Sequence, residues 1–141
     1  MFDEINVYAS KAFLDLVNKS RSAKVSCILA AQSLSDLESA ESAAFKEQVI
    51  ENCNNYLIMR QNSSKNAEEW ANIVGTKDSV DVTYQLKKEF GISSDTGAGS
   101  LRKTKEYIIH PDIIKNFAVG KGFFVSKDRQ IKTKVTINKP F

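Results

Sequence analysis

The sequence lacks the residues and runs that mark several common classes of protein. It has one histidine and two cysteines, Cys27 and Cys53, which are not spaced as a CxxC pair. The usual zinc-binding spacing is therefore missing, and two unlinked thiols are typical of a cytoplasmic protein. No apolar run approaches the length of a membrane span, and the N-terminus has no basic-then-apolar secretory pattern.

A glycine-rich phosphate-binding loop is also missing. No GxxxxGK[ST] motif occurs among the 141 residues. Residues 97–100 (GAGS) contain no lysine, and residues 120–122 (GKG) precede a predicted strand, where such a loop would precede a helix. We therefore expect that this chain by itself does not bind ATP tightly.

Charge is distributed unevenly along the chain. The net charge is +3, but residues 1–75 carry −3 (7 Lys or Arg, 10 Asp or Glu) and residues 76–141 carry +6 (13 and 7). We predict a single domain, 1–141, with an α/β core (1–75) and a basic extension (76–141) that polyanions would meet. The alternative, and the commoner meaning of such a charge bias, is a solvated basic surface with no specific partner. The candidates for contact with DNA or a partner are Arg102, Lys103, Lys105, Lys132 and Lys134, and the same basic set includes Lys121, Lys127 and Arg129.

The acidic half alternates between helical and strand patterns. Helices are predicted after Ser10, Ser42 and Asn66, where apolar residues recur at helical spacing. Residues 25–31 and 56–60 are short apolar runs, typical of strands that are covered on both faces. The resulting order α-β-α-β-α predicts right-handed crossovers and a mainly parallel sheet between helical layers.

The basic half has a different character. Residues 80–84 alternate as a half-exposed strand, whereas residues 91–103, which begin GISSDTGAGS, bury little and are predicted to form a mobile loop. Pro111 is well placed in the first turn of a short helix. Residues 123–125 and 130–137 flank a turn, which predicts an antiparallel hairpin at the edge of the sheet.

An acidic pair stands at the start of the pattern. Asp3 and Glu4 follow Phe2, where a strand would end, and Gln32 ends the next predicted strand. Open α/β sheets bind ligands at the carboxyl ends of their strands, so these three residues are candidates for one phosphate site. In nucleotide-driven motors one carboxylate helps to hold magnesium and another group positions water. The alternatives are a surface acid at a frayed terminus and a structural or capping glutamine.

Arg21 follows the first predicted helix in a polar context. One interpretation is an arginine that reaches across a subunit boundary to a phosphate. The other is a solvated arginine that the dipole of the helix favours. No nucleophile, base and orienting residue cluster in the sequence, so a complete small enzyme is not indicated.

Several segments resemble one family. FDEINVYAS, LVNKSRSAKVSCILAAQSLSDLE, ENCNNYLIMR and NAEEWANIVGT are similar to the C-terminal half of the RecA-like motor of type IV coupling proteins. These are the TraD/TraG-type ATPases of conjugation and type IV secretion. EYIIHPDIIKNFAVGKGFFVSK resembles the end of the same motor domain. The resemblance implies a partial RecA-like (P-loop NTPase) α/β fold.

The resemblance also implies roles for single residues. Asp3 and Glu4 correspond to the Walker B pair, with Asp3 supporting magnesium and Glu4 activating water. Gln32 corresponds to a sensor of the terminal phosphate, and Arg21 to the arginine offered to a neighbouring subunit's ATP. ATP and Mg²⁺ would then be cofactors of the longer parent protein. Its implied partners are a relaxosome accessory protein or relaxase, DNA, the secretion channel and further copies in a homo-hexamer at the cytoplasmic face of the bacterial inner membrane.

Two departures from the family shape the functional hypothesis. The phosphate-binding loop and the N-terminal membrane anchor of the family are both missing from the sequence. We therefore expect a fragment of a coupling ATPase that links the relaxosome to the secretion channel, and in isolation serves in partner recognition without catalysis. The alternative is a self-contained degenerate adaptor that binds DNA or a protein. Salt-dependent binding to unrelated DNA duplexes would distinguish a DNA-binding surface from a protein-binding one.

Overall fold

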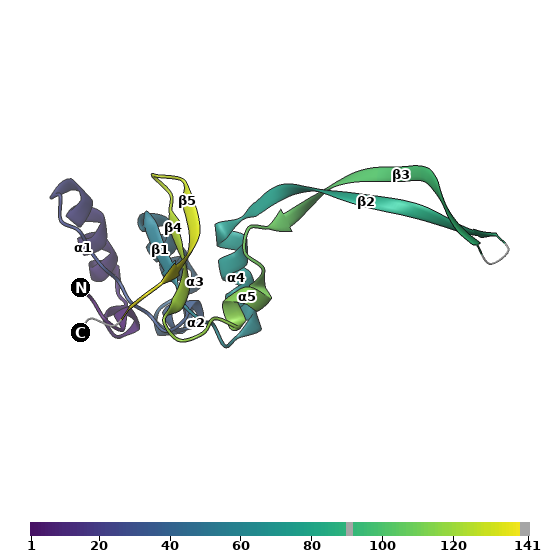
Figure 1. Cartoon of the computed structure of the whole chain (residues 1–141). Coiled ribbons are helices and arrows are strands. Elements are labelled where there is room, and N and C mark those ends of the chain that lie inside the picture. Colours follow the sequence, from purple (N-terminus) through teal and green to yellow (C-terminus); the bar gives the residue numbers. More distant parts are fainter. Residues whose placement is uncertain (90–91, 139–141) are drawn as a thin grey trace.

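A long two-stranded ribbon extends from a block of helices and a small sheet (Figure 1). The computed structural model describes residues 1–89 and 92–138. The elements in these ranges are η1 (Ile5–Tyr8), α1 (Lys11–Ser22), α2 (Leu34–Ala40), α3 (Ala43–Asn52), β1 (Asn55–Ile58), α4 (Ser64–Val74), β2 (Thr76–Glu89), β3 (Ile92–Tyr107), α5 (Pro111–Lys115), β4 (Lys121–Ser126) and β5 (Ile131–Thr136). β2 and β3 form the ribbon, and the other elements form the block.

Serine side chains cap the N-termini of the first three α-helices. The Oγ of Ser10 accepts a hydrogen bond from the backbone N–H of Phe13 (3.2 Å), and the Oγ of Ser42 accepts one from Phe45 (3.1 Å). Ser33 caps α2 in the same way. Each bond satisfies an amide that a helix N-terminus leaves without a partner. The helix starts predicted at Ser10 and Ser42 are thus confirmed, and α2 is an additional helix.

The helices α1, α2 and α3 pack together through one apolar cluster. Its buried members are Ile5, Phe13, Leu14, Val17, Leu34, Leu37, Phe45 and Val49. Phe45 is only 1% exposed. Full burial of one such side chain contributes about 1.5–3 kcal/mol. The cluster therefore fixes α2, and with it Gln32 just before this helix, against the rest of the block.

A buried lysine joins three helices. The Nζ of Lys46 in α3 lies 3.0 Å from a carboxylate oxygen of Glu38 in α2 and 2.7 Å from one of Glu69 in α4. The hydrogen bond with Glu69 raises the pKa of Lys46, and the hydrogen bond with Lys46 lowers the pKa of Glu38. A lowered carboxyl pKa contributes stability above its unfolded-state value, and this contribution is lost as the pH falls through the folded-state value. The junction of the three helices therefore weakens in acid.

A second apolar cluster lies between the sheet and the helices α4 and α5. The strand β4 is central, because it pairs antiparallel with β1 on one side and with β5 on the other. The buried members are Tyr56, Ile58, Ala67, Ala71, Val74, Ile109, Ile114, Phe117, Phe123 and Val125. The predicted C-terminal antiparallel hairpin is confirmed by β4 and β5, and Pro111 stands in the first turn of α5 as predicted.

Two glycines permit this packing. Gly75 ends α4 with a φ of +93°, a conformation that other residues rarely adopt, and its N–H donates to the carbonyl of Ala71 (3.0 Å). On β4, a Cβ added to Gly122 would lie 2.8 Å from the carbonyl oxygen of Ile58. Glycine at these positions lets α4 turn directly into β2 and lets β4 approach β1.

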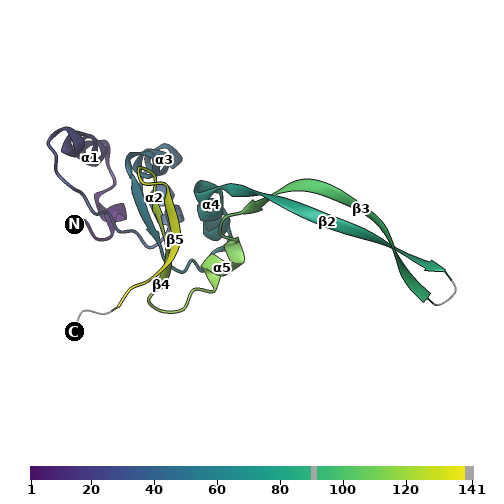
Figure 2. The same cartoon turned by 45° about the horizontal axis from the view of Figure 1, so that its top comes forward.

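The ribbon of β2 and β3 extends away from the block in both views (Figures 1 and 2). Its strands pair antiparallel, from Thr76 with Tyr107 to Glu89 with Ile92. At about 3.3 Å per residue, the 14 residues of β2 span roughly 45 Å. The predicted loop at 91–103 is therefore wrong for residues 92–103, which belong to β3, while Gly91 lies outside the described residues. Residues 92–103 contain few apolar residues and therefore looked like a loop. They form a strand because the backbone of β2 provides their hydrogen-bond partners.

We expect the block to fold without the outer part of the ribbon. β2 and β3 form a sheet of their own, and neither apolar cluster contains a residue of these strands among those the structure describes. Replacing residues 80–103 by Asn-Gly, which favours a two-residue hairpin turn, should change the melting temperature by less than about 3 °C. Circular dichroism measures this shift. Loss of cooperative unfolding in the trimmed chain would contradict the expectation.

The predicted mainly parallel, three-layer sheet is wrong, although the mixed α/β class is confirmed. Within the described residues both sheets are antiparallel, and parallel pairing is confined to an isolated bridge between Phe2 and Leu29. Residues 25–31 are extended without forming a ladder, and Val25 and Ile28 are more than half exposed. An apolar run predicts a buried strand only if neighbouring strands cover its edges, and that depends on residues elsewhere in the chain.

Candidate functional site

The bridge between Phe2 and Leu29 joins the N-terminal residues to the extended segment 25–31. The N–H of Phe2 donates to the carbonyl of Ile28 (2.8 Å), and the N–H of Ala30 donates to the carbonyl of Phe2 (2.9 Å). Both strands of this short pairing run in the same direction. Their next residues therefore emerge side by side at the same end.

The residues that emerge there are the predicted phosphate-site candidates. The Nε2 of Gln32 donates to the Oε1 of Glu4 at 3.4 Å. Asp3 is the neighbour of Glu4, and its Oδ1 accepts the backbone N–H of Glu4 (3.1 Å). All three side chains are exposed. The structure thus brings Glu4 and Gln32 into contact, with the carboxylate of Asp3 beside them.

The backbone of Glu4 has an uncommon conformation. Its φ of 49° and ψ of 57° lie in the left-handed region, which non-glycine residues seldom occupy. The bridge at Phe2 holds it on one side, and Ile5, only 2% exposed, holds it on the other. Residues held in such conformations by their surroundings are concentrated at functional sites. The strain at Glu4 therefore supports a role for its position beyond packing.

The chemistry of this cluster fits a magnesium ion that is also held by a phosphate. Magnesium prefers oxygen ligands and usually takes one or two carboxylates, together with water and phosphate oxygens. Asp3 and Glu4 offer two carboxylates on an exposed edge. Among the described residues, no group of three or more His, Cys, Asp or Glu side chains could hold a metal ion. The cluster can therefore supply part of such a site and needs ligands from elsewhere.

An apolar cavity of about 770 Å³ separates residues 26–33 from β1. Leu29 and Gln32 line it from one side, and Leu57 lines it from the other. β1 is an edge strand, since β4 is its one neighbour in the described sheet. The cavity therefore lies between an unpaired strand edge and the extended segment that leads to Gln32.

Two ionisable groups in the cavity wall are desolvated. Burial raises the pKa of the Cys53 thiol and of the Tyr56 hydroxyl. Both groups are therefore neutral at neutral pH. This part of the wall consequently presents an uncharged, largely apolar surface to whatever fills the cavity.

Arg21 lies in the last turn of α1. The 12 residues of this helix span about 18 Å, and the acidic pair precedes its start. Figure 1 shows the end of α1 projecting away from α2 and the sheet. The backbone of Arg21 thus lies at the opposite end of α1 from Asp3 and Glu4.

Three of the predicted basic contacts lie on the ribbon. Arg102, Lys103 and Lys105 are exposed residues of β3. Because side chains alternate along a strand, Lys103 and Lys105 share one face and Arg102 takes the other. In the pairing, Lys105 stands opposite Asp78. The ribbon therefore carries mixed charge and a short row of two lysines on one face.

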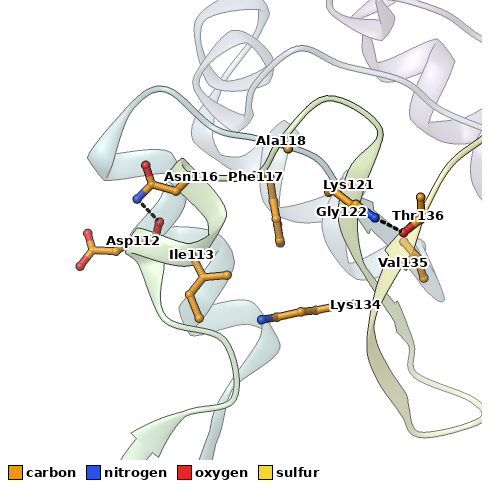
Figure 3. Close-up of a pocket in the computed structure, with 10 residues that line it drawn as sticks. All are labelled: Asp112, Ile113, Asn116, Phe117, Ala118, Lys121, Gly122, Lys134, Val135 and Thr136. Atoms are coloured by element: carbon orange, nitrogen blue, oxygen red, sulfur yellow. Dashed lines mark hydrogen bonds between the residues drawn. The ribbon is translucent and has the colours of Figure 1, made fainter.

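The other two predicted contacts lie on β5 and differ in their surroundings. The Nζ of Lys132 donates to the carbonyl of Val74 at the end of α4 (2.6 Å). A cation near a helix C-terminus is favoured by the helix dipole, so Lys132 joins the hairpin to α4. Lys134 instead extends into a cavity beside α5 (Figure 3).

Sequence reasoning missed this second cavity. Its volume is about 560 Å³. It lies between α5 and the open end of the β4–β5 hairpin, where β4 begins and β5 ends. Ile113 of α5 and Phe117, which follows this helix, line it, whereas the sequence predicted only a short helix with Pro111 in its first turn. Apolar residues four apart have the same spacing in a core and in a cavity wall, so the sequence held no signal for the difference.

A family comparison identifies the group to which the chain is related. The family TraG-D_C, described as the TraM recognition site of TraD and TraG, matches residues 1–118. The chain belongs to this family. The resemblance to TraD/TraG-type coupling proteins, predicted from the sequence segments, is thereby confirmed.

A solved structure shares the fold of this family member. The bacterial conjugative coupling protein TrwBdeltaN70 matches with a TM-score of 0.79 and 16% identity, over 99% of this chain and 31% of that one. The chain thus spans less than a third of the length of that protein. A comparison with curated proteins found no match. None of the helices in the described ranges is both long and apolar enough to cross a membrane.

Proposed function

We propose that this family member supplies one side of an ATP and magnesium site in a conjugative coupling protein, and that it takes part in recognising an accessory protein of the relaxosome. The observation that carries the first part is the contact between Glu4 and Gln32 (3.4 Å). A carboxylate and an amide emerge together from two chain segments that are joined by a parallel bridge, and α/β motors place groups that act on phosphate at the carboxyl ends of parallel strands.

The three residues of the edge take different roles in this proposal. Asp3 supports the magnesium ion, Glu4 accepts the proton of the attacking water, and Gln32 contacts the terminal phosphate. Arg21 serves a neighbouring subunit of a homo-hexamer, since its helix end projects away from the acidic edge of its own chain. When bound, ATP supplies the phosphoryl group and magnesium neutralises its charge.

The missing side of the site would come from elsewhere in the coupling protein. The 141 residues contain no phosphate-binding loop. Gln32 is one of the residues that line the apolar cavity between residues 26–33 and β1, which lies beside an unpaired strand edge. Strands in a sheet lie about 4.8 Å apart, so the cavity is a place where a further strand of the coupling protein would pair with the free edge of β1.

The partner role rests on the family description. A TraM recognition site implies an accessory protein of the relaxosome as partner. In the whole coupling protein, we propose that the segment helps to link this protein, or a relaxase, and the DNA to a type IV secretion channel. That protein would be anchored at the cytoplasmic face of the inner membrane and use ATP to move DNA.

Calorimetric titration of the purified chain with ATP and Mg²⁺, with hydrolysis assayed in the same sample, tests the half-site. We expect no saturable binding at sub-millimolar nucleotide and no turnover, because the phosphate-binding loop is missing. A TraM-type accessory protein added to a second sample should bind. Tight nucleotide binding, with turnover lost in a Glu4→Gln variant, would show that the chain builds a complete site and would refute the half-site.

A second candidate function is a self-contained adaptor that binds DNA through the ribbon. The exposed positions of Arg102, Lys103 and Lys105 favour it. Binding to duplexes of unrelated sequence that weakens steeply with added salt would support this function. Selective, salt-insensitive binding to a protein would support the accessory-protein role.

A further inference from the structure

The cavity between α5 and the β4–β5 hairpin has an apolar floor. Phe117 forms part of it and is 7% exposed, with Val135 on the side of β5 (Figure 3). The volume of about 560 Å³ lies within the range of sites that bind small molecules or single anchoring side chains. An apolar group of a ligand would therefore gain burial here.

Exposed apolar side chains occur in the lining of this cavity, at Ile113, and next in the chain to the lining residues Ala118 and Thr136, at Val119 and Ile137. Ile113 is 39% exposed, Val119 is 89% exposed and Ile137 is 42% exposed. The N–H of Ile137 donates to the carbonyl of Gly120 (2.7 Å), which holds the loop of Val119 beside the end of β5. Apolar side chains gathered on a surface, with a cavity among them, are typical of a contact site for another molecule.

The charge that faces into the cavity is positive. Figure 3 shows the ammonium group of Lys134 extending toward Ile113, whereas the carboxylate of Asp112 points away. Asp112 lies 3.3 Å from the Nδ1 of His110, and the Nζ of Lys121 donates to the Oγ1 of Thr136 (2.7 Å). None of the ion pairs formed by the described side chains involves Lys134.

The outer edge of β5 offers hydrogen-bonding groups as well. In the described sheet β5 pairs only with β4, so one side of its backbone has no strand beside it. An extended peptide can add to such an edge, where the backbone supplies affinity and side-chain pockets supply specificity. Lys134 and Val135, which line the cavity, belong to this strand.

We infer that this cavity binds an extended acidic peptide segment, with an apolar side chain on Phe117 and a carboxylate against Lys134. The inference deepens the accessory-protein role proposed above and rests on it for the identity of the partner. Charge complementarity favours an acidic partner. A nucleic acid is disfavoured, because the floor of the cavity is apolar and a single lysine extends into it.

The probe is the peptide acetyl-Glu-Asp-Leu-Phe-Glu-amide, titrated into the chain and followed by backbone-amide NMR shifts. Its controls are acetyl-Gln-Asn-Leu-Phe-Gln-amide, which lacks the charge, and acetyl-Glu-Asp-Ser-Ser-Glu-amide, which lacks the apolar anchor. We expect saturable shifts at Ile113, Lys134 and Val135 with the first peptide, and at least about tenfold weaker binding of either control.

Charge reversal in the chain provides the matched test. Lys134→Glu should weaken binding of the first peptide by about tenfold or more, and Lys134→Gln by less. Lys11→Glu makes the same charge change at an exposed position at the start of α1, outside every proposed contact, and should leave binding unaltered. No binding of the first peptide, or equal binding by the wild-type chain and both Lys134 variants, would overturn the inference.

A TraM-type accessory protein separates this inference from the proposed function. If it binds the wild-type chain and the Lys134→Glu variant equally, the partner role stands and this surface is wrong. If it binds neither, while the acidic peptide still binds at Lys134, the cavity stands and the proposed partner role falls. If the Lys134→Glu variant binds the accessory protein and the peptide more weakly than the wild-type chain does, the result supports the partner role and the cavity as its binding site.

Discussion

Replacing Glu4 by glutamine in the coupling protein that carries this segment is expected to lower ATP turnover by at least about 100-fold. Glutamine has nearly the same size and retains a polar contact with Gln32, but its amide cannot accept the proton of the attacking water. Nucleotide binding should change by less than about threefold, because the base acts in the chemical step. Phosphate release and nucleotide titration measure the two quantities.

The control for this variant is Glu41→Gln. Glu41 is an exposed glutamate just after α2 and lies outside the proposed site. The Glu41→Gln substitution should leave ATP turnover unaltered. If turnover in the Glu4 variant stays within about threefold of the wild-type rate, Glu4 is not the base, and the contact with Gln32 would then be structural.

Replacing Phe45 by alanine is expected to produce the largest loss of stability in the block. Phe45 is 1% exposed in the cluster that joins α1, α2 and α3. Removal of a buried phenylalanine side chain costs about 3–5 kcal/mol, through lost apolar burial and the cavity that remains. The free energy of unfolding of a domain is about 5–15 kcal/mol. The variant should therefore lose much of its stability or be unfolded. Urea unfolding followed by circular dichroism measures the loss.

Two variants check the physical reason for this loss. Phe45→Leu keeps most of the apolar volume and should cost clearly less than the alanine variant. Val119→Ala also removes apolar atoms, but from a side chain that is 89% exposed, and should change the free energy of unfolding by less than about 0.5 kcal/mol. Equal losses in the two Phe45 variants would mean that the cavity does not determine the cost.

Structure that depends on close neighbours in the chain was predictable. Ser10 and Ser42 each accept a hydrogen bond from an amide three residues further on, so both partners appear in one short window of sequence. Pro111 and the hairpin of β4 and β5 are local in the same sense. The relation to TraD and TraG was also visible in short segments, and the family match covers residues 1–118.

Structure that depends on a distant partner was not predictable. Asn66 was predicted to cap α4, but it lies inside that helix, is 4% exposed and accepts a hydrogen bond from Ser35, 31 residues away. Residues 92–103 looked like a loop and form a strand, because β2 pairs with them. Residues 25–31 looked like a buried strand and form no ladder, because within the described part of the chain their strand pairing is limited to the bridge between Leu29 and Phe2.

The candidate sites divide in the same way. The sequence by itself determined which residue types stand at Asp3, Glu4 and Gln32, and that each follows an extended segment. Only the tertiary structure decided that Glu4 and Gln32 touch, through a bridge between chain segments 27 residues apart. Lys132 and Lys134 have similar sequence surroundings, yet one is held by α4 and the other lines a cavity beside α5. Neighbouring residues determine local hydrogen bonds and the spacing of apolar side chains. The surroundings of a side chain depend instead on which distant elements pack against it.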